Sequence, residues 1–133
     1  MTDDLLHAAA SLAGILAREN TALATLDLAA AAALVAEKRL AAAAFAAAHA
    51  RLAAAGAPLG SNRDALGQAS WRLHDLAAEN RTLLIRAMAV QARVLDIIAQ
   101  AVPRASAQAP RYGAEGALVG HTHAPPVAIV ASV

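Results

Sequence analysis

The chain has 133 residues and a formal net charge of +1, from 11 basic and 10 acidic residues that are scattered along it. This predicts one domain with no basic patch for nucleic acid, and the absence of cysteine excludes disulfides and thiolate chemistry. Hydrophobic residues make up 59%, but 42 residues are alanine and three are aromatic, so closely packed long helices are expected rather than a large core.

The first helical stretch is expected over residues 3–24, with Thr2 or Asp3 as its cap. Apolar residues recur there at the three- and four-residue spacing of a helix, at Leu5, Leu12, Ile15, Leu16, Leu23 and Leu26. Thr25 or Asp27 could cap a new helix, so a break or kink is predicted at residues 24–27. The alternative is one helix over residues 3–55, about 80 Å long at 1.5 Å per residue.

The second stretch, residues 27–55, is nearly all alanine. Its larger apolar residues are Leu34, Val35, Leu40, Phe45 and Leu52. An alanine face buries less area per turn than a leucine face, so it stabilises a neighbour less. Glycine and proline over residues 56–60 predict the end of this helix and a short turn between antiparallel neighbours.

The third stretch is predicted as a long helix over residues 62–102, capped by Ser61 or Asn62 and ended by Pro103. Its apolar residues cover about half of the circumference at 100° per residue, which is more than one neighbour needs. They are Leu66, Leu73, Leu76, Leu83, Leu84, Val90, Val94, Ile97 and Ile98, with Met88, Leu95 and Val102 at the edge. Asn80 and Gln91 fall within this face and are candidates for polar residues that fix helix register.

This face exceeds what an alanine-rich neighbour can cover, which predicts an interaction surface. The N-terminal helix, a second copy of the chain or a partner's helix could cover it, and the sequence leaves the three open. A local repeat links two of the stretches, since Leu16-Ala17-Arg18-Glu19-Asn20 is echoed 60 residues later by Leu76-Ala77-Ala78-Glu79-Asn80. In so alanine-rich a chain the repeat could be coincidence, and Asn80 is the stronger register candidate.

Residues 103–133 hold four of the five prolines and are predicted to be a flexible tail after a helical domain of residues 1–102. The apolar residues 127–130 and Val133 could form a short strand or a docked peptide. The five histidines are dispersed, and the pair His121 and His123 lacks a cysteine or nearby carboxylate to complete a metal site. No nucleophile elbow or phosphate-binding loop is present, so neither catalysis nor a metal or other cofactor is expected.

Several residues along the chain occur in a distinctive order. The order is Trp71, Leu73, Leu76, Asn80, Leu83-Leu84, Pro103 and then Tyr112-Gly113-Ala114-Glu115-Gly116, with Ala36-Glu37-Lys38 upstream. This order resembles the FlgN family of flagellar type III export chaperones. The most specific part is the Asn-x-x-Leu-Leu segment followed about 30 residues later by Tyr-Gly-Ala-x-Gly. The resemblance covers roughly residues 5–116.

The resemblance implies a small cytoplasmic helical chaperone that binds hook-associated proteins, shields their helical ends and delivers them to the export gate and its ATPase apparatus. It implies a client-binding role for the C-terminal part and a gate-docking role for Tyr112, with Gly113 and Gly116 beside it. The expected client-binding residues are Leu73, Leu76, Asn80, Leu83, Leu84, Gln91, Val94 and Ile98.

The sequence thus predicts an all-α antiparallel bundle or hairpin of long helices with a flexible tail. The acidic N-terminus lacks the basic region of a signal peptide, and charges interrupt the apolar runs, so a cytoplasmic location without stable membrane insertion is expected. The alternative function is a self-associating structural or surface-coating protein of the phasin type, for which amphipathic alanine-rich helices are equally suitable. A homo-oligomer is compatible with either function.

Overall fold

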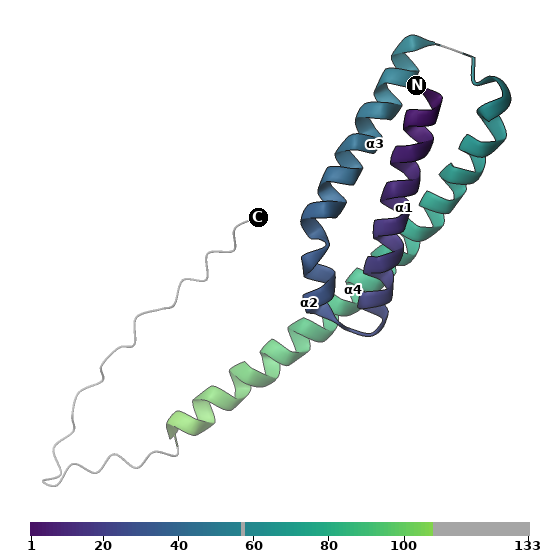
Figure 1. The fold of residues 1–133 in the computed structure, drawn as a ribbon. Helices are drawn as coiled ribbons and strands as arrows, with labels where there is room; N and C mark the ends of the chain where they lie inside the picture. The colour runs from purple at the N-terminus through teal and green to yellow at the C-terminus, as the bar shows by residue number, and fades with distance from the viewer. Residues whose placement is uncertain (57, 108–133) are drawn as a thin grey trace, which may run out of the picture. The chain divides into compact units, whose positions relative to one another are not determined.

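The computed structural model describes residues 1–56 and 58–107, and every regular element in that part of the chain is helical. The elements are α1 (Thr2–Ala24), α2 (Leu28–Ala33), α3 (Val35–Ala55), a 3₁₀ turn (Gly60–Asn62) and α4 (Arg63–Ala107). Successive arms alternate in direction, so α1 runs one way, α2 and α3 return, and α4 runs beside α1 in the direction of α1 (Figure 1). The predicted all-α antiparallel architecture is confirmed.

The chain divides into two compact units, Met1–Leu95 and Asp96–Val133. The first contains α1, α2, α3 and residues 63–95 of α4, and the described part of the second is the last portion of α4. None of the described helices is long and apolar enough to cross a membrane.

The predicted break after the first helix is confirmed. Leu26 adopts the left-handed conformation with φ 57°, which a leucine rarely adopts, and the turn reverses the chain. Asp27 caps α2, because its side chain accepts a hydrogen bond of 3.0 Å from the Ala30 N–H. At the other end of α1 the predicted cap is wrong, since the helix already begins at Thr2 and Met1 occupies the cap position.

The second stretch is two helices rather than the single one predicted over residues 27–55. Leu34 separates α2 from α3, and its N–H donates to the Ala31 oxygen at 3.1 Å, which tightens the last turn of α2. The α-helical pattern resumes when Lys38 N–H donates to the Leu34 oxygen at 2.8 Å. The surrounding run of alanines provides little side-chain packing to keep this turn regular, whereas Leu34 itself is buried.

The predicted end of α3 at glycine is confirmed. Gly56 has φ 56° and caps the helix in the left-handed conformation, which costs a glycine little. After the 3₁₀ turn, α4 begins at Arg63, with Asn62 immediately before it. The Asn62 amide donates to the Asp3 carboxylate at 3.4 Å and thereby connects the starts of α4 and α1.

The predicted end of the long helix at residue 102 is wrong by five residues, because α4 continues through Pro103 to Ala107. Proline removes one backbone donor and favours a kink, but it does not prevent the following residues from adopting helical dihedral angles.

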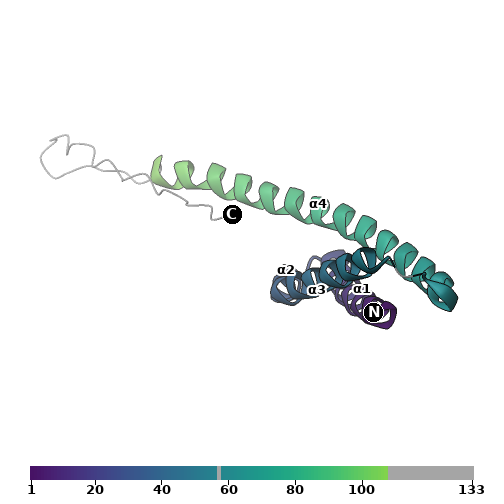
Figure 2. The ribbon, with the colours of Figure 1, turned by 90° about the horizontal axis from the view of Figure 1, so that it is seen from above.

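The described residues of the first unit form three hydrophobic clusters, and α1 contributes to each of them. In both ribbon views α1 lies beside α3 and the first part of α4 (Figures 1 and 2). Leu5 packs with Leu52 of α3, Leu16 packs with Leu73 of α4, and Leu23 packs among residues of α2 and α4. Alanines fill much of the remaining contact surface, at Ala8, Ala9, Ala13, Ala31, Ala48 and Ala87. The N-terminal helix is therefore the element that covers the first part of the wide α4 face.

Candidate functional site

The wide apolar face of α4 has a covered portion and an exposed portion. In the covered portion Leu73 is buried, and Leu76, Leu83 and Leu84 are partly buried against α1. These four leucines were predicted to bind a partner, but their side chains already pack within the bundle. They therefore support the fold, and a partner can reach them only in part.

The fifth predicted residue of the covered portion, Asn80, lies in a cluster of polar side chains, which we call the polar pin: Glu19, Asn20, Lys38, Glu79 and Asn80. The Asn80 amide donates to Glu19 Oε2 at 2.7 Å and to Asn20 Oδ1 at 2.9 Å. The Asn20 amide donates in turn to Glu79 Oε2 at 3.0 Å and to the Leu76 backbone oxygen at 3.1 Å. Each asparagine thus binds the glutamate of the other helix.

The two copies of the sequence repeat lie side by side in this cluster. Because α1 and α4 run in the same direction, the offset of 60 residues places Glu19 and Asn20 at the level of Glu79 and Asn80. A paired asparagine at a helix interface fixes register, since sliding either helix by one turn would leave buried amides without partners. The predicted burial of Asn80 with hydrogen-bond partners is therefore confirmed, its register role stays a prediction, and the two copies of the repeat are in contact.

A buried charge lies at the centre of the polar pin. The Glu19 side chain is only 2% exposed, and Lys38 Nζ donates to both of its carboxylate oxygens at 2.8 Å. Lys38 comes from α3, so the ion pair adds the third helix to the network. Every buried side-chain nitrogen and oxygen in residues 1–56 and 58–102 has a hydrogen-bond partner. The cluster is thus internally complete, which suits a structural role rather than a reactive one.

Sequence reasoning missed Glu19 and Lys38 as members of this network. The repeat contained a signal for Glu19. In a parallel helix pair an offset of 60 residues places Glu19 and Asn20 at the level of Glu79 and Asn80. Nothing in the local pattern distinguished Lys38 from a solvated lysine in an alanine-rich helix.

Exposure changes abruptly along α4 after Ala87. Leu73, Asn80, Ala87 and Val94 follow each other at intervals of seven residues and occupy one line along the helix. The first three are buried, with Ala87 5% exposed, but Val94 is 50% exposed. The cause is the length of α1, which ends at Ala24 just after Leu23 has packed against Ala87.

We call the uncovered part of this face within the first unit the exposed stripe: Met88, Val90, Gln91, Val94 and Leu95. At 100° per residue these residues span an arc of about 160°. All five are exposed, and Met88 is 66% exposed. Gln91, predicted as a second register residue, lies on this exposed surface and is not part of the polar pin.

In the second unit, Ile97, Ile98 and Val102 are also exposed, so the predicted residue Ile98 is available to solvent. Tyr112, Gly113 and Gly116, predicted to dock on an export gate, lie outside the described residues. Trp71, which is part of the motif order, is 70% exposed and meets His74 edge-on.

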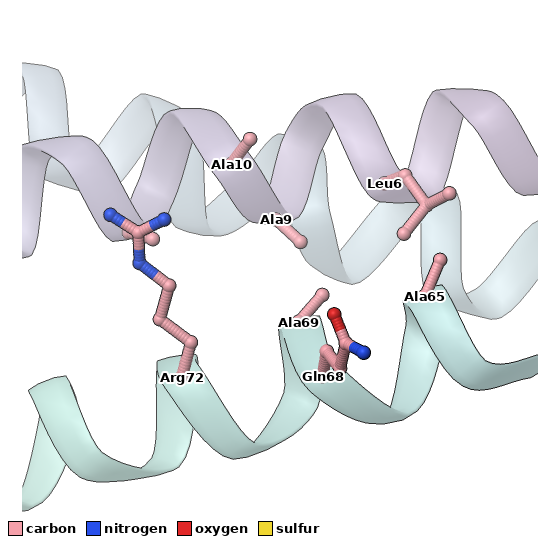
Figure 3. Close-up of a pocket in the computed structure, with 8 residues that line it drawn as sticks. Leu6, Ala9, Ala10, Ala65, Gln68, Ala69 and Arg72 are labelled. Carbon is pink, nitrogen blue, oxygen red and sulfur yellow. The ribbon is translucent and has the colours of Figure 1, made fainter.

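The cavities of the first unit are shallow grooves between helices. One, of about 290 Å³, lies between α1 and α4 and is lined mainly by alanines, with Leu6, Gln68 and Arg72 (Figure 3). A second, of about 400 Å³, has Phe45, His49 and Ser70 among its lining residues. Among the described residues no three His, Asp or Glu side chains are grouped so that they could hold a metal ion. The arrangement is suited to protein contact through an apolar helix surface.

Comparisons with protein-family models, with curated proteins and with solved structures found no match to this chain.

Proposed function

We propose that the protein is a chaperone that holds a helical segment of a partner protein against the exposed stripe of α4. The observation that carries the proposal is the exposure of Val94 and its neighbours on a helix face whose earlier part, from Leu73 to Ala87, is buried in a bundle. A face that packs one helix over several turns has the side-chain spacing needed to accept another helix further along.

The polar pin supports this proposal because its hydrogen bonds link α4, which carries the exposed stripe, to α1 and through Glu19 to α3. Register between α1 and α4 is fixed by the paired asparagines, so the exposed stripe is held at a constant position relative to α1. A preformed surface loses less conformational freedom on binding than a flexible one. Holding a partner in this way requires neither a nucleotide nor a cofactor.

The residue order supports a narrower proposal, in which the chain acts as a FlgN-like export chaperone. Its clients would be hook-associated proteins, whose helical termini it would shield in the cytoplasm before delivery to the flagellar export gate. In this proposal Tyr112, Gly113 and Gly116 dock on the gate, and Ile98 of the second unit also contacts the client. The role of these residues stays a prediction.

Co-expression tests the narrower proposal. The full chain is co-expressed with each hook-associated protein of its own genome and, separately, with an exported flagellar protein from another part of the filament. We expect a stable complex with at least one hook-associated protein and none with the control. Tyr112→Ala should preserve that complex and reduce secretion of the client, whereas failure to form any complex would reject the narrower proposal.

A second candidate function is self-association into a structural or surface-coating layer. It is favoured by Leu40 and Val35 of α3, which are 74% and 45% exposed and lie on a different helix from the exposed stripe. Sedimentation of the purified chain distinguishes the two functions. Large stable oligomers in the absence of a partner would favour the coating function, and a monomer or small oligomer favours the chaperone.

A further inference from the structure

The charges on the turns of α4 that carry the exposed stripe are basic. Residues 81–95 contain Arg81, Arg86 and Arg93 and no aspartate or glutamate, and Asp96, the next residue, accepts a hydrogen bond of 3.1 Å from the Gln100 amide. The three arginines are exposed, and none of them forms an ion pair or side-chain hydrogen bond within the part of the chain that the structure describes. On the bundle side, the acidic residue of α4 nearest in sequence is Glu79, and both it and Glu19 of α1 are already engaged in the polar pin.

These arginines border the exposed stripe on both sides. At 100° per residue Arg86 and Arg93 fall about 40° and 60° beyond Val90, at one edge. Arg81 falls about 20° beyond Met88, at the other edge, and the exposed Ile85 lies about 40° beyond Arg81. The apolar surface thus has basic residues along both margins, while its middle, at Gln91 and Val94, is uncharged.

We infer that the exposed stripe selects a partner helix whose own apolar seam is bordered by aspartate or glutamate on both edges. This inference rests on the proposed helix-binding function and adds the chemical class of the partner. When two such helices pack through their seams, the margins come together, so unpaired arginines on one helix favour carboxylates on the other. Because the margins stay partly solvated, the charges contribute mainly to selectivity and to the rate of association.

The same charges argue against a second copy of the chain on this surface. Two exposed stripes packed together would place arginine margins beside arginine margins, which is unfavourable. An anionic lipid surface would also attract arginines. The helix partner is favoured because the exposed stripe continues the seven-residue line of Leu73, Asn80 and Ala87, which already packs against α1, and because Gln91 lies in its middle.

Two synthetic amphipathic helical peptides test the inference. They share one apolar seam and differ only at the margins, which carry glutamate in one peptide and lysine in the other. Binding to the full chain is measured by titration calorimetry at low and high salt. We expect the glutamate peptide to bind at least about tenfold more tightly, and the difference to shrink at high salt as the charges are screened.

Matched variants locate the effect. The variant Arg81→Glu, Arg86→Glu, Arg93→Glu should reverse the preference, whereas Arg39→Glu, Arg51→Glu, Arg63→Glu, which changes the net charge equally at exposed sites elsewhere, should retain it. Circular dichroism and thermal melting establish that both variants are folded.

Each outcome has a distinct consequence. Equal binding of both peptides would overturn the charge inference and leave helix binding intact, whereas no binding of either peptide to the folded chain would reject the proposed function as well. Vesicles of phosphatidylglycerol and of phosphatidylcholine provide the remaining comparison. Tight binding to the anionic vesicles without binding to the glutamate peptide would assign the surface to lipid and overturn the inference.

Discussion

At the scale of single residues, the most informative feature is the burial of Glu19 with two polar partners, which together donate three hydrogen bonds to its carboxylate. Burying a carboxylate is costly unless it is paired and hydrogen-bonded, and here Lys38 and Asn80 fulfil both conditions. Such a network contributes less to stability than an apolar core of the same volume would, and more to the choice of one helix register. The free energy of unfolding should therefore fall most when one member of the Glu19–Lys38 ion pair is removed and the other is left buried.

Replacing Lys38 by methionine should destabilise the protein by about 2–3 kcal/mol, because the buried Glu19 carboxylate would lose its counterion. The control is Arg18→Met, which breaks the ion pair with Glu37. Those two side chains are 60% and 52% exposed, so the change should cost less than about 0.5 kcal/mol. Urea denaturation of both variants measures the difference, and equal losses would argue that the Glu19–Lys38 pair adds nothing.

Asn80 could be predicted as a register residue, whereas Gln91 could not be separated from it by sequence. Both amides fall on the apolar face of one helix, and helical periodicity treats them alike. The difference arises from the end of α1 at Ala24, which leaves Gln91 without a facing helix. Tertiary contact decided which amide became buried.

At the scale of elements, the helix ends were predicted where a side chain or a glycine has a specific role. Asp27 caps α2 and Gly56 ends α3, both as expected. The division at Leu34 could not be predicted, because it occurs within an alanine run that has no capping residue or glycine. The extension of α4 past Pro103 was missed for a related reason, since proline disfavours a helix interior without forbidding it.

Two glycine substitutions should have opposite effects on stability. Gly14 lies within α1, and a methyl group there would meet nothing within 4 Å, so Gly14→Ala should stabilise by about 0.5–1 kcal/mol through helix propensity. Gly56 has φ 56°, so Gly56→Ala should destabilise by about 1 kcal/mol. Thermal denaturation of the two variants measures both signs. Stabilisation by Gly56→Ala would contradict the left-handed cap.

At the scale of the whole chain, the sequence predicted an α4 face wider than its neighbour could cover, but not which part would stay open. Which part stays open depends on the parallel pairing of α1 with α4 at an offset of 60 residues. The repeat indicates this offset only when the two helices are already known to run side by side in the same direction. As a result, Leu73, Leu76, Leu83 and Leu84 were assigned to a partner although they pack mainly against α1. Among the predicted apolar binding residues of the first unit, Val94 is the one that is exposed, at 50%.

In the proposed function the partner helix binds the exposed stripe of α4 and not the exposed apolar residues of α3. Two variants are compared by titration calorimetry, and the helical terminus of a hook-associated protein is the ligand. Met88→Gln, Val94→Gln changes the exposed stripe, and Val35→Gln, Leu40→Gln changes equally exposed apolar residues on α3. All four positions are exposed, so both variants should keep the stability of the parent chain.

We predict that Met88→Gln, Val94→Gln weakens binding at least about tenfold, as expected for the loss of two apolar contacts, while Val35→Gln, Leu40→Gln binds as the parent chain does. Undiminished binding by the folded Met88→Gln, Val94→Gln variant would contradict binding of the partner helix to the exposed stripe.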